Sequence, residues 1–431
     1  MIEILDIRQQ ENFSKVVLRE VEDMTAVTKA VEDILIDVKL NGDSALREYT
    51  ARFDGAEIAD IEVTGEEIGN ALKQTDKEML EIFHKAAKNI TDYHKEQIYE
   101  GYTLEKEGII MGQRINAIEN VGIYIPGGTA AYPSTVLMDV IPARLAGVSN
   151  IYIATPPRKD GSVDSAVLAA ANIAQANRVF KVGGAQAIAA FCYGTETIPK
   201  VDLIVGPGNI YVSAAKKILY GTVGIDMIAG PSDVLIIADD TANAKYIAAD
   251  MLSQAEHDEN SSSILISISE AVAKEVIKNL NQQLPLLTRS SIAKASIKNN
   301  GRIFLVKDIS SAIELTNHIA PEHLEIQTQD PFTVMQKINN AASIFLGSYT
   351  PEAIGDYYAG PNHTLPTLRS ARFASPLSVD SFRKKSSFLG YSKQAFEKDA
   401  LAVEAFALFE GLTAHANSIK VRRNESVEIS E

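Results

Sequence analysis

Apolar positions along the chain change their spacing near residue 121. Before it, the segment from about 65 to 99 has apolar residues at helical intervals among many charges, which predicts a long amphipathic helix. Residues 1–25 mix charged and apolar positions without a clear period. We therefore expect the first quarter of the chain to be mainly helical.

From residue 121, short β-branched runs alternate with Gly/Pro loops and Ala-rich helical stretches. The runs are VGIYI (121–125), NIYIA (150–154), RVFKV (178–182) and VDLIV (201–205). Strands separated by helices of this length need crossover connections, which favour a parallel, right-handed sheet covered on both faces. This segment is therefore expected to form an α/β layer.

A second series of the same kind follows. The pattern predicts strands at 234–238, 263–268, 302–306, 323–327 and 342–346, and helices at about 241–257, 269–283, 309–318 and 331–339. The predicted fold class is α/β, with two Rossmann-like parallel-sheet domains and small helical segments at the N- and C-terminal ends.

Two later segments depart from this alternation. Residues 349–378 are rich in Gly, Pro and Tyr and show no period, and loops of that length are usually functional. An apolar period then predicts a helix at about 393–417, followed by a polar tail.

Composition excludes several classes of protein. A chain of 431 residues with 46% hydrophobic content can bury a large core and is expected to form two to four domains. The formal net charge of −15 repels a phosphate backbone, so nucleic acid is not an expected partner. No apolar run reaches the ~18 residues that a membrane-spanning helix needs, so no membrane association is expected.

The cysteine content and the start of the chain favour the cytoplasm. The single cysteine, Cys192, cannot form an intramolecular disulfide, and MIEILDIRQQ has acids where a signal peptide has bases. Cys192 lies among Ala and Phe in a predicted helix, which indicates a small buried residue and not a nucleophile.

Three Gly-rich loops follow predicted strands: IPGGTA (125–130), VGGAQA (182–187) and VGPGN (205–209). Loops at the carboxyl ends of parallel strands converge on one edge, where backbone N–H groups and the helix N-termini near Gln186 and Asn209 favour a phosphate. Tight turns in any α/β protein would look the same, and the G-x-G-x-x-G fingerprint is absent. A nucleotide site is one of two interpretations.

Two further groups suggest chemistry. Gln254 and His257 are three apart on a predicted helix and project from one face, which suits either a borderline metal or a polar helix end. Glu322 and His323 follow Pro321, which ends a helix and favours extended backbone at Ala320. This pair suits proton transfer if the corner is irregular; on a regular strand the two side chains face opposite ways.

Eight strings together identify a resemblance. They are GIYIPGGTA, VGGAQAIAA, VDLIVGPGNIYV, VGIDMIAGPSDV, LSQAEHD, APEHLE, GDYYAGPNHTLPT and EGLTAH. Their order and approximate spacing resemble those of the histidinol dehydrogenase family over residues 25–420. The resemblance implies an NAD-dependent, zinc-containing oxidoreductase that converts L-histidinol through L-histidinaldehyde to L-histidine, the last step of histidine biosynthesis.

The resemblance also implies roles for individual residues. Glu322 and His323 match the catalytic acid–base pair, and Tyr124, Gln186 and Asn209 match NAD contacts. Gln254, His257, Asp356 and His415 match the ligands of one zinc ion per subunit. The residues matching substrate contacts are Ser232, Gln254, His257, His323, Asp356, Glu410 and His415. Asp233 is a departure, because the family more often has Glu there.

An intertwined homodimer with active sites shared between subunits is also implied. The expected domains are an N-terminal extension (1–24), a discontinuous α/β domain (25–122 with 235–376), an NAD-contacting α/β domain (123–234) and a C-terminal dimerisation segment (377–431). Alternatives are a related zinc/NAD dehydrogenase for another primary alcohol, such as a sulfonated diol, and a metal-dependent hydrolase.

Overall fold

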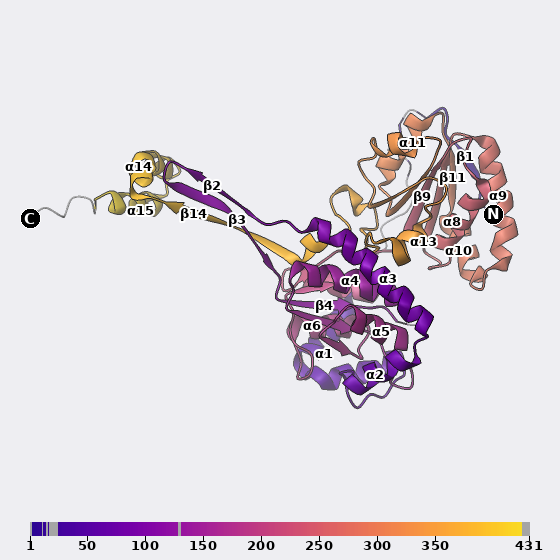
Figure 1. Ribbon diagram of the computed structural model, residues 1–431, viewed down its shortest axis with the longest axis horizontal. Coiled ribbons are helices and arrows are strands. Elements are labelled where there is room, and N and C mark those ends of the chain that lie inside the picture. Colours follow the sequence, from indigo (N-terminus) through magenta and orange to yellow (C-terminus); the bar gives the residue numbers. More distant parts are fainter. Residues whose placement is uncertain (1, 11, 14–15, 17–24, 128–130, 425–431) are drawn as a thin grey trace, which may run out of the picture. The chain divides into compact units, whose positions relative to one another are not determined.

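The computed structural model describes residues 2–10, 12–13, 16, 25–127 and 131–424. The chain divides into two units, one within residues 1–98 and 118–382 and the other within 99–117 and 383–431 (Figure 1). Most described residues belong to the first unit, which contains two parallel sheets.

The first parallel sheet has the strand order β6-β5-β4-β7-β8. Its strands are β4 (Asn120–Tyr124), β5 (Asn150–Ala154), β6 (Arg178–Phe180), β7 (Leu203–Val205) and β8 (Gly224–Ile225). Its crossover helices are α4 (Pro133–Ala146), α5 (Ser165–Ile173), α6 (Gly184–Tyr193) and α7 (Ile210–Leu219). All neighbouring strands pair in parallel, as the alternating pattern predicted.

The second parallel sheet has the order β1-β11-β10-β9-β12-β13. Its strands are β1 (Ile4–Asp6), β9 (Asp233–Ala238), β10 (Ser262–Ser267), β11 (Arg302–Leu305), β12 (His323–Gln327) and β13 (Ser343–Leu346). The helices are α8 (Ala244–Ala255), α9 (Glu270–Gln283), α10 (Ser290–Asn300), α11 (Ile309–Ile319) and α12 (Pro331–Met335). The predicted second sheet is confirmed, while α10 and the edge strand β1 were not predicted.

The first quarter of the chain is helical as expected, but its helices pack on the first parallel sheet and not on the second, with which they had been grouped. The helices are α1 (Thr25–Tyr49), α2 (Gly65–Gln74) and α3 (Lys77–His94). α1 packs on α6 and α7, α2 on α5, and α3 on α4, so all three cover the first parallel sheet. Grouping residues 25–122 with 235–376 was therefore wrong, because amphipathic spacing shows that a face is buried but not against what. The single helix expected at 65–99 is two, since Asp76 caps a new one.

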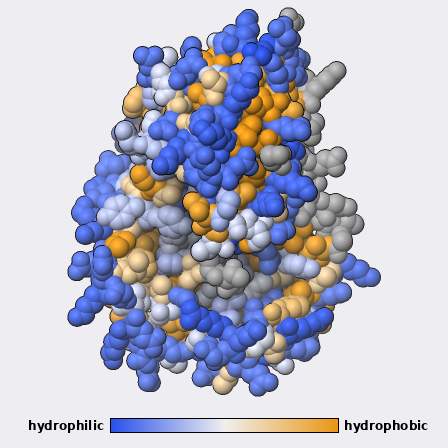
Figure 2. All heavy atoms as spheres, turned by 90° about the vertical axis from the view of Figure 1, so that its right-hand side faces the viewer, coloured by the Kyte–Doolittle hydropathy of each residue, from blue (hydrophilic) through white to orange (hydrophobic). Residues whose placement is uncertain are grey.

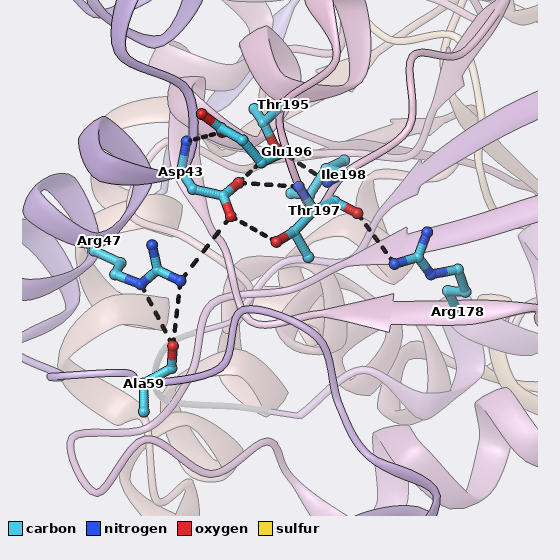
Figure 3. A network of polar contacts seen from close by, with 8 residues as sticks. All are labelled: Asp43, Arg47, Ala59, Arg178, Thr195, Glu196, Thr197 and Ile198. Carbon is cyan, nitrogen blue, oxygen red and sulfur yellow. Dashed lines mark hydrogen bonds and ion pairs between the residues drawn. The ribbon is translucent and has the colours of Figure 1, made fainter.

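A polar network fixes the kink of α1. Gly42 has φ 51°, and a Cβ atom there would lie 2.3 Å from Oε2 of Glu196, so glycine is required. Asp43 then accepts hydrogen bonds from the hydroxyls of Thr195 (2.7 Å) and Thr197 (2.5 Å) (Figure 3). These bonds join α1 to the segment after α6, which helps to hold the first sheet's helical cover in place.

The second unit is an antiparallel sheet with two helices. Strands β2 (Tyr102–Lys106), β3 (Ile109–Ala117) and β14 (Arg383–Tyr391) pair in the order β14-β3-β2. The helices are α14 (Lys393–Phe409) and α15 (Thr413–Asn424), in place of the one helix expected at 393–417. Gly411 has φ 76° and ends α14. The expected C-terminal segment (377–431) therefore omitted residues 99–117, which belong to the same unit in the structure. The expected division had placed these residues in the first domain.

Two expectations about environment can also be compared with the structure. The Cys192 side chain is buried in the apolar core, as expected for a small structural residue. Among the described residues, no helix is long and apolar enough to cross a membrane. On the face shown in Figure 2, hydrophilic residues predominate, with apolar residues in smaller areas between them.

Candidate functional site

A pocket of about 990 Å³ opens at the carboxyl ends of the first parallel sheet. Residues at the ends of four strands contribute to its lining, together with residues from α1 and the turn at 50–54. They are Tyr124 and Pro126 at the end of β4, Thr155–Lys159 after β5, Gly184–Gln186 after β6 and Asn209 after β7. The chain changes direction across the sheet between β4 and β7, which is where open α/β sheets bind ligands. Tyr124, Gln186 and Asn209, the three residues expected at the cofactor, all line this pocket.

Local bonds hold two of these three side chains, Tyr124 and Asn209. The backbone N–H of Gly184 donates to the Tyr124 hydroxyl oxygen at 3.0 Å, and burial raises the pKa of Tyr124 to about 12. Oδ1 of Asn209 accepts from the backbone of Tyr211 and Val212 and so caps α7. Oε1 of Gln186 is buried without a hydrogen-bond partner among the described residues, so it is available to a ligand.

The first Gly-rich loop is described only in part. Of IPGGTA (125–130), residues 128–130 lie outside the described residues. Pro126, Gly127 and Ala131 on either side line the pocket.

Glu322 and His323 meet at the amino ends of β9 and β12, where both contact Asp233. The backbone N–H of Asp233 donates to Oε2 of Glu322 at 3.0 Å, and the Glu322 N–H donates to Oδ1 of Asp233 at 3.1 Å. Nδ1 of His323 lies 3.1 Å from the Asp233 carbonyl oxygen, so this nitrogen bears the proton and donates. The Ser232 hydroxyl lies 3.4 Å from Oε1 of Glu322, which places the expected substrate serine beside the acid.

The corner before this pair is irregular, as a shared site requires. α11 ends at Ile319 and Ala320 has φ 55°, a left-handed conformation that costs energy for a residue with a Cβ atom. The expected extended geometry of Ala320 was therefore wrong. Its N–H bonds back to the Thr316 carbonyl at 2.8 Å, and this helix cap outweighs the preference imposed by Pro321.

Burial and neighbouring charge perturb the acid–base pair. Burial raises the pKa of Glu322 to about 7, against the opposing effect of His323. Burial alone would lower the pKa of His323, but the carboxylates of Glu322, Asp356 and Glu352 outweigh it and raise the pKa well above its ordinary value. The Phe345 ring packs against the imidazole with centroids 6.0 Å apart. A buried acid and base with perturbed pKa values thus share one site, which is typical of a functional site.

Two of the expected metal ligands, His257 and Asp356, meet beside this pair. α8 runs back from the carboxyl end of β9, so Gln254 on its last turn and His257 just after the helix lie towards the amino ends of the strands. Single ligand atoms of His257, Asp356 and Glu352 lie within 4.8 Å of one another. Oδ1 of Asp356 is also 3.5 Å from Nε2 of His323.

The chemistry of these donors fits a divalent cation. Gln254 is 1% exposed, and its Oε1 has no hydrogen-bond partner among the described residues, an arrangement that costs energy unless a ligand binds there. Burial would raise the pKa of Asp356, but its hydrogen bond with His323 and the charge of that ring lower it; burial lowers the pKa of His257. Zinc binds the ionised form of a carboxylate and the neutral form of an imidazole, and the amide oxygen of Gln254 needs no change of protonation.

Sequence reasoning missed Glu352. It lies on the short helix α13 (Glu352–Ile354), and Asp356 follows on the π-helical turn Gly355–Ala359. Both carboxylate oxygens of Glu352 are buried without partners among the described residues, and burial raises its pKa to about 8. The i, i+4 spacing of two acids in PEAIGD was the signal that could have found it.

The last two expected site residues belong to the second unit. Glu410 follows α14, and His415 is exposed on α15. Their participation in the site stays a prediction.

Two parallel sheets, a large pocket at strand ends and a buried acid–base pair beside convergent metal-ligating atoms define an α/β enzyme. The histidinol dehydrogenase family profile matches residues 17–423. Histidinol dehydrogenases from Clostridium acetobutylicum and Bacillus cereus are 52% and 50% identical, covering 96% and 98% of this chain and 96% and 100% of those proteins. The crystal structure of histidinol dehydrogenase from Elizabethkingia anophelis superposes with a TM-score of 0.94 at 40% identity, over 98% of each chain. The chain belongs to the histidinol dehydrogenase family.

Proposed function

We propose that this chain oxidises L-histidinol through L-histidinaldehyde to L-histidine, the last step of histidine biosynthesis, with NAD and one zinc ion per subunit. The supporting observation is that the base His323 adjoins the convergent atoms of His257 and Asp356, so one small substrate can meet both. Gln254, His257 and Asp356 would hold the zinc, with His415 as the remaining ligand. The pocket lined by Tyr124, Gln186 and Asn209 would hold NAD.

The reaction removes two hydrides, so two NAD molecules act in turn while the aldehyde stays bound. When bound, zinc supplies a Lewis acid that orients the imidazole and amino group of the substrate, and NAD accepts hydride. In the neutral form of His323 the proton is on Nδ1, which donates to Asp233, so Nε2 of that form takes the hydroxyl proton as the first hydride leaves. Glu322 then takes a proton from the water that hydrates the aldehyde, before the second hydride transfer.

An NADH absorbance assay tests this function against its alternatives. We expect two NADH per histidinol consumed, with histidine as product. Oxidation of a sulfonated diol in preference to histidinol would favour the related alcohol dehydrogenase. Substrate cleavage that needs no NAD would favour the hydrolase and overturn the proposal.

Because Glu322 is assigned to the aldehyde step and His323 to the alcohol step, Glu322→Gln should slow the aldehyde step more than the alcohol step. The amide cannot accept a proton from water, so oxidation of supplied histidinaldehyde should slow by about 10²-fold or more, and the alcohol step by less. Single-turnover NADH formation from each substrate measures both steps. Glu256→Gln serves as the matched control, because it removes a carboxylate that no step uses. Equal loss of both steps in Glu322→Gln would contradict the division.

We further propose that the chain forms a homodimer through its second unit. α14 exposes many apolar side chains there, including Leu401 (63%), Phe406 (65%) and Phe409 (90%), and β14 adds Leu389 (67%). Exposed apolar surface of this density is typical of a protein interface. A site completed by Glu410 and His415 of the partner would explain why these residues lie in the unit that carries this surface.

A complementation experiment tests shared sites. His323→Asn and His415→Asn are each expected to inactivate the enzyme. When the two are coexpressed, random pairing should restore roughly a quarter of wild-type activity, since half the dimers contain one intact site. Coexpression that restores no activity, with mixed dimers verified by differential tags, would place all ligands of a site in one chain.

A further inference from the structure

We propose that Glu325 is a positioning residue of the candidate metal site. With Gln327 and Asp250 it forms a buried polar bridge between two segments that carry expected zinc ligands. These segments are α8, which carries Gln254, and α13 with the turn after it, which carries Asp356. Glu325 acts through these ligands and does not bind the ion itself. The inference rests on the zinc ion in the function proposed above and leaves the expected ligand set unchanged.

One face of β12 carries both the base and the bridge. Alternate residues of a strand point the same way, so His323, Glu325 and Gln327 share a face. All three are buried, and Glu325 is 1% exposed. Leu324 and Ile326 point the other way, into the apolar core. Burying three polar side chains on one strand is costly unless they are bonded, so their bonds indicate their role.

The Glu325 carboxyl group fixes the start of α13. Its Oε1 accepts a hydrogen bond from the Glu352 N–H at 3.0 Å. The N-cap residue of this helix, Pro351, supplies no side-chain bond, so Glu325 satisfies an N–H group that would otherwise be buried and unpaired. The chain runs directly from α13 into the π-helical turn that carries Asp356. Glu325 therefore holds the segment that presents this carboxylate.

The same carboxyl group is bonded towards α8 through its other oxygen. Nε2 of Gln327 donates to Oε2 of Glu325 and to Oδ2 of Asp250, both at 2.9 Å. Burial and the charge of Asp250 raise the pKa of Glu325 well above its ordinary value, which favours the neutral acid, and Glu325 also hydrogen-bonds with Asp250 directly. Asp250 lies four residues before Gln254, one turn away on the same face of α8.

The bridge thus joins two ligand-bearing segments that lie far apart in the sequence. Side chains that orient metal ligands typically change metal affinity by about 10- to 100-fold when they are replaced. Without the Glu325 carboxyl group, the Glu352 N–H and the Asp250 carboxylate each lose a buried hydrogen-bond partner. The two segments are then no longer held at a fixed separation, so zinc binding should weaken.

The experiment measures the zinc affinity of the full-length protein without NAD or histidinol, by competition with a chromophoric chelator. Glu325→Met keeps the length of the side chain but removes its hydrogen bonds, and it should weaken zinc binding by about 10- to 100-fold. Glu325→Gln keeps an oxygen for the Glu352 N–H and an N–H for Asp250, so it should bind zinc nearly as tightly as wild type. The visible spectrum of the cobalt-substituted protein should change in Glu325→Met and not in Glu325→Gln.

Two further variants separate positioning from stability. Gln327→Met breaks the bridge on the side of α8 and should also weaken zinc binding. The matched control is Ser267→Ala at the carboxyl end of β10, which removes a buried hydrogen bond of the same sheet, from the Ser267 hydroxyl to the Ser269 carbonyl at 3.0 Å. Its zinc affinity and cobalt spectrum should match wild type, even if thermal unfolding shows a loss of stability.

The outcomes distinguish positioning from charge and from general destabilisation. Wild-type zinc affinity in folded Glu325→Met would overturn the proposal. An equal loss in Glu325→Gln would also overturn it, because charge and not hydrogen bonding would then set the affinity, and so would an equal loss in Ser267→Ala. If circular dichroism shows that Glu325→Met does not fold, wild-type affinity in Gln327→Met would overturn the proposal instead. Wild-type protein that binds no zinc would contradict the proposed metal function, and this inference with it.

Discussion

Replacing His323 with asparagine should lower kcat for histidinol oxidation by about 10²-fold or more, the usual effect of losing a positioned base. Nδ1 of the imidazole donates to the Asp233 carbonyl, which leaves Nε2 as the proton acceptor of the neutral ring. An asparagine amide can keep a bond to that carbonyl, but it cannot accept a proton near neutral pH. Initial rates of NADH formation at saturating histidinol measure the loss.

The same variant should keep its metal, because His323 is not among the expected zinc ligands. Metal analysis of purified His323→Asn should therefore match wild type. His84→Asn is a suitable control, since His84 is exposed on α3 in the first unit. Turnover within a few-fold of wild type would remove His323 from the role of base, and loss of metal would assign it to metal binding instead.

The repeated βα pattern was predictable because its signal is local. The inner strands of the two parallel sheets are short apolar runs, and burial on both faces keeps those runs apolar, whereas the edge strands β1 and β8 are less buried. The antiparallel strands β2 and β14 lacked such a signal. Every residue of β2 is exposed, so neither an apolar run nor an alternation marks it.

Long-range packing was not predictable from the pattern. The apolar face of α1 shows that it is buried, but only the fold reveals α6 and α7 as its partners. The helix break at Asp76 and the cap at Ala320 were set by single residues, Asp76 through its carboxylate and Ala320 through an unfavourable φ angle. The spacing of apolar residues over a long segment does not reveal such effects of single residues.

In the candidate site, too, local patterns were predictable and long-range contacts were not. Gln254 and His257 were suggested by their spacing on one helix, and the Glu322–His323 pair by its position after Pro321. Their meeting with Asp356 depends on the strand order of the second sheet, which places the starts of β9 and β12 side by side. Motif resemblance supplied that long-range information before the structure did, but it did not supply Glu352.

These converging ligand atoms lead to the second large effect: removing the metal should abolish histidinol oxidation, and added zinc should restore it. Prolonged dialysis against a chelator should leave less than about 1% of the starting activity, because a metal that orients the substrate contributes several kcal/mol to the reaction. Dialysis without chelator controls for simple inactivation. Restoration by zinc or a similar divalent ion, but not by Mg²⁺, is expected from a site that includes an imidazole.

Metal removal should also lower stability, which gives a measurement independent of turnover. The metal-free site leaves the carboxylate oxygens of Glu352 and Oε1 of Gln254 buried without hydrogen-bond partners among the described residues. Zinc at 100 times its dissociation constant should add about 2.7 kcal/mol to the free energy of unfolding of a protein with one site. Thermal unfolding with and without zinc measures this gain. Full activity in protein verified as metal-free would show that the convergence of His257, Glu352 and Asp356 serves the fold and not the reaction.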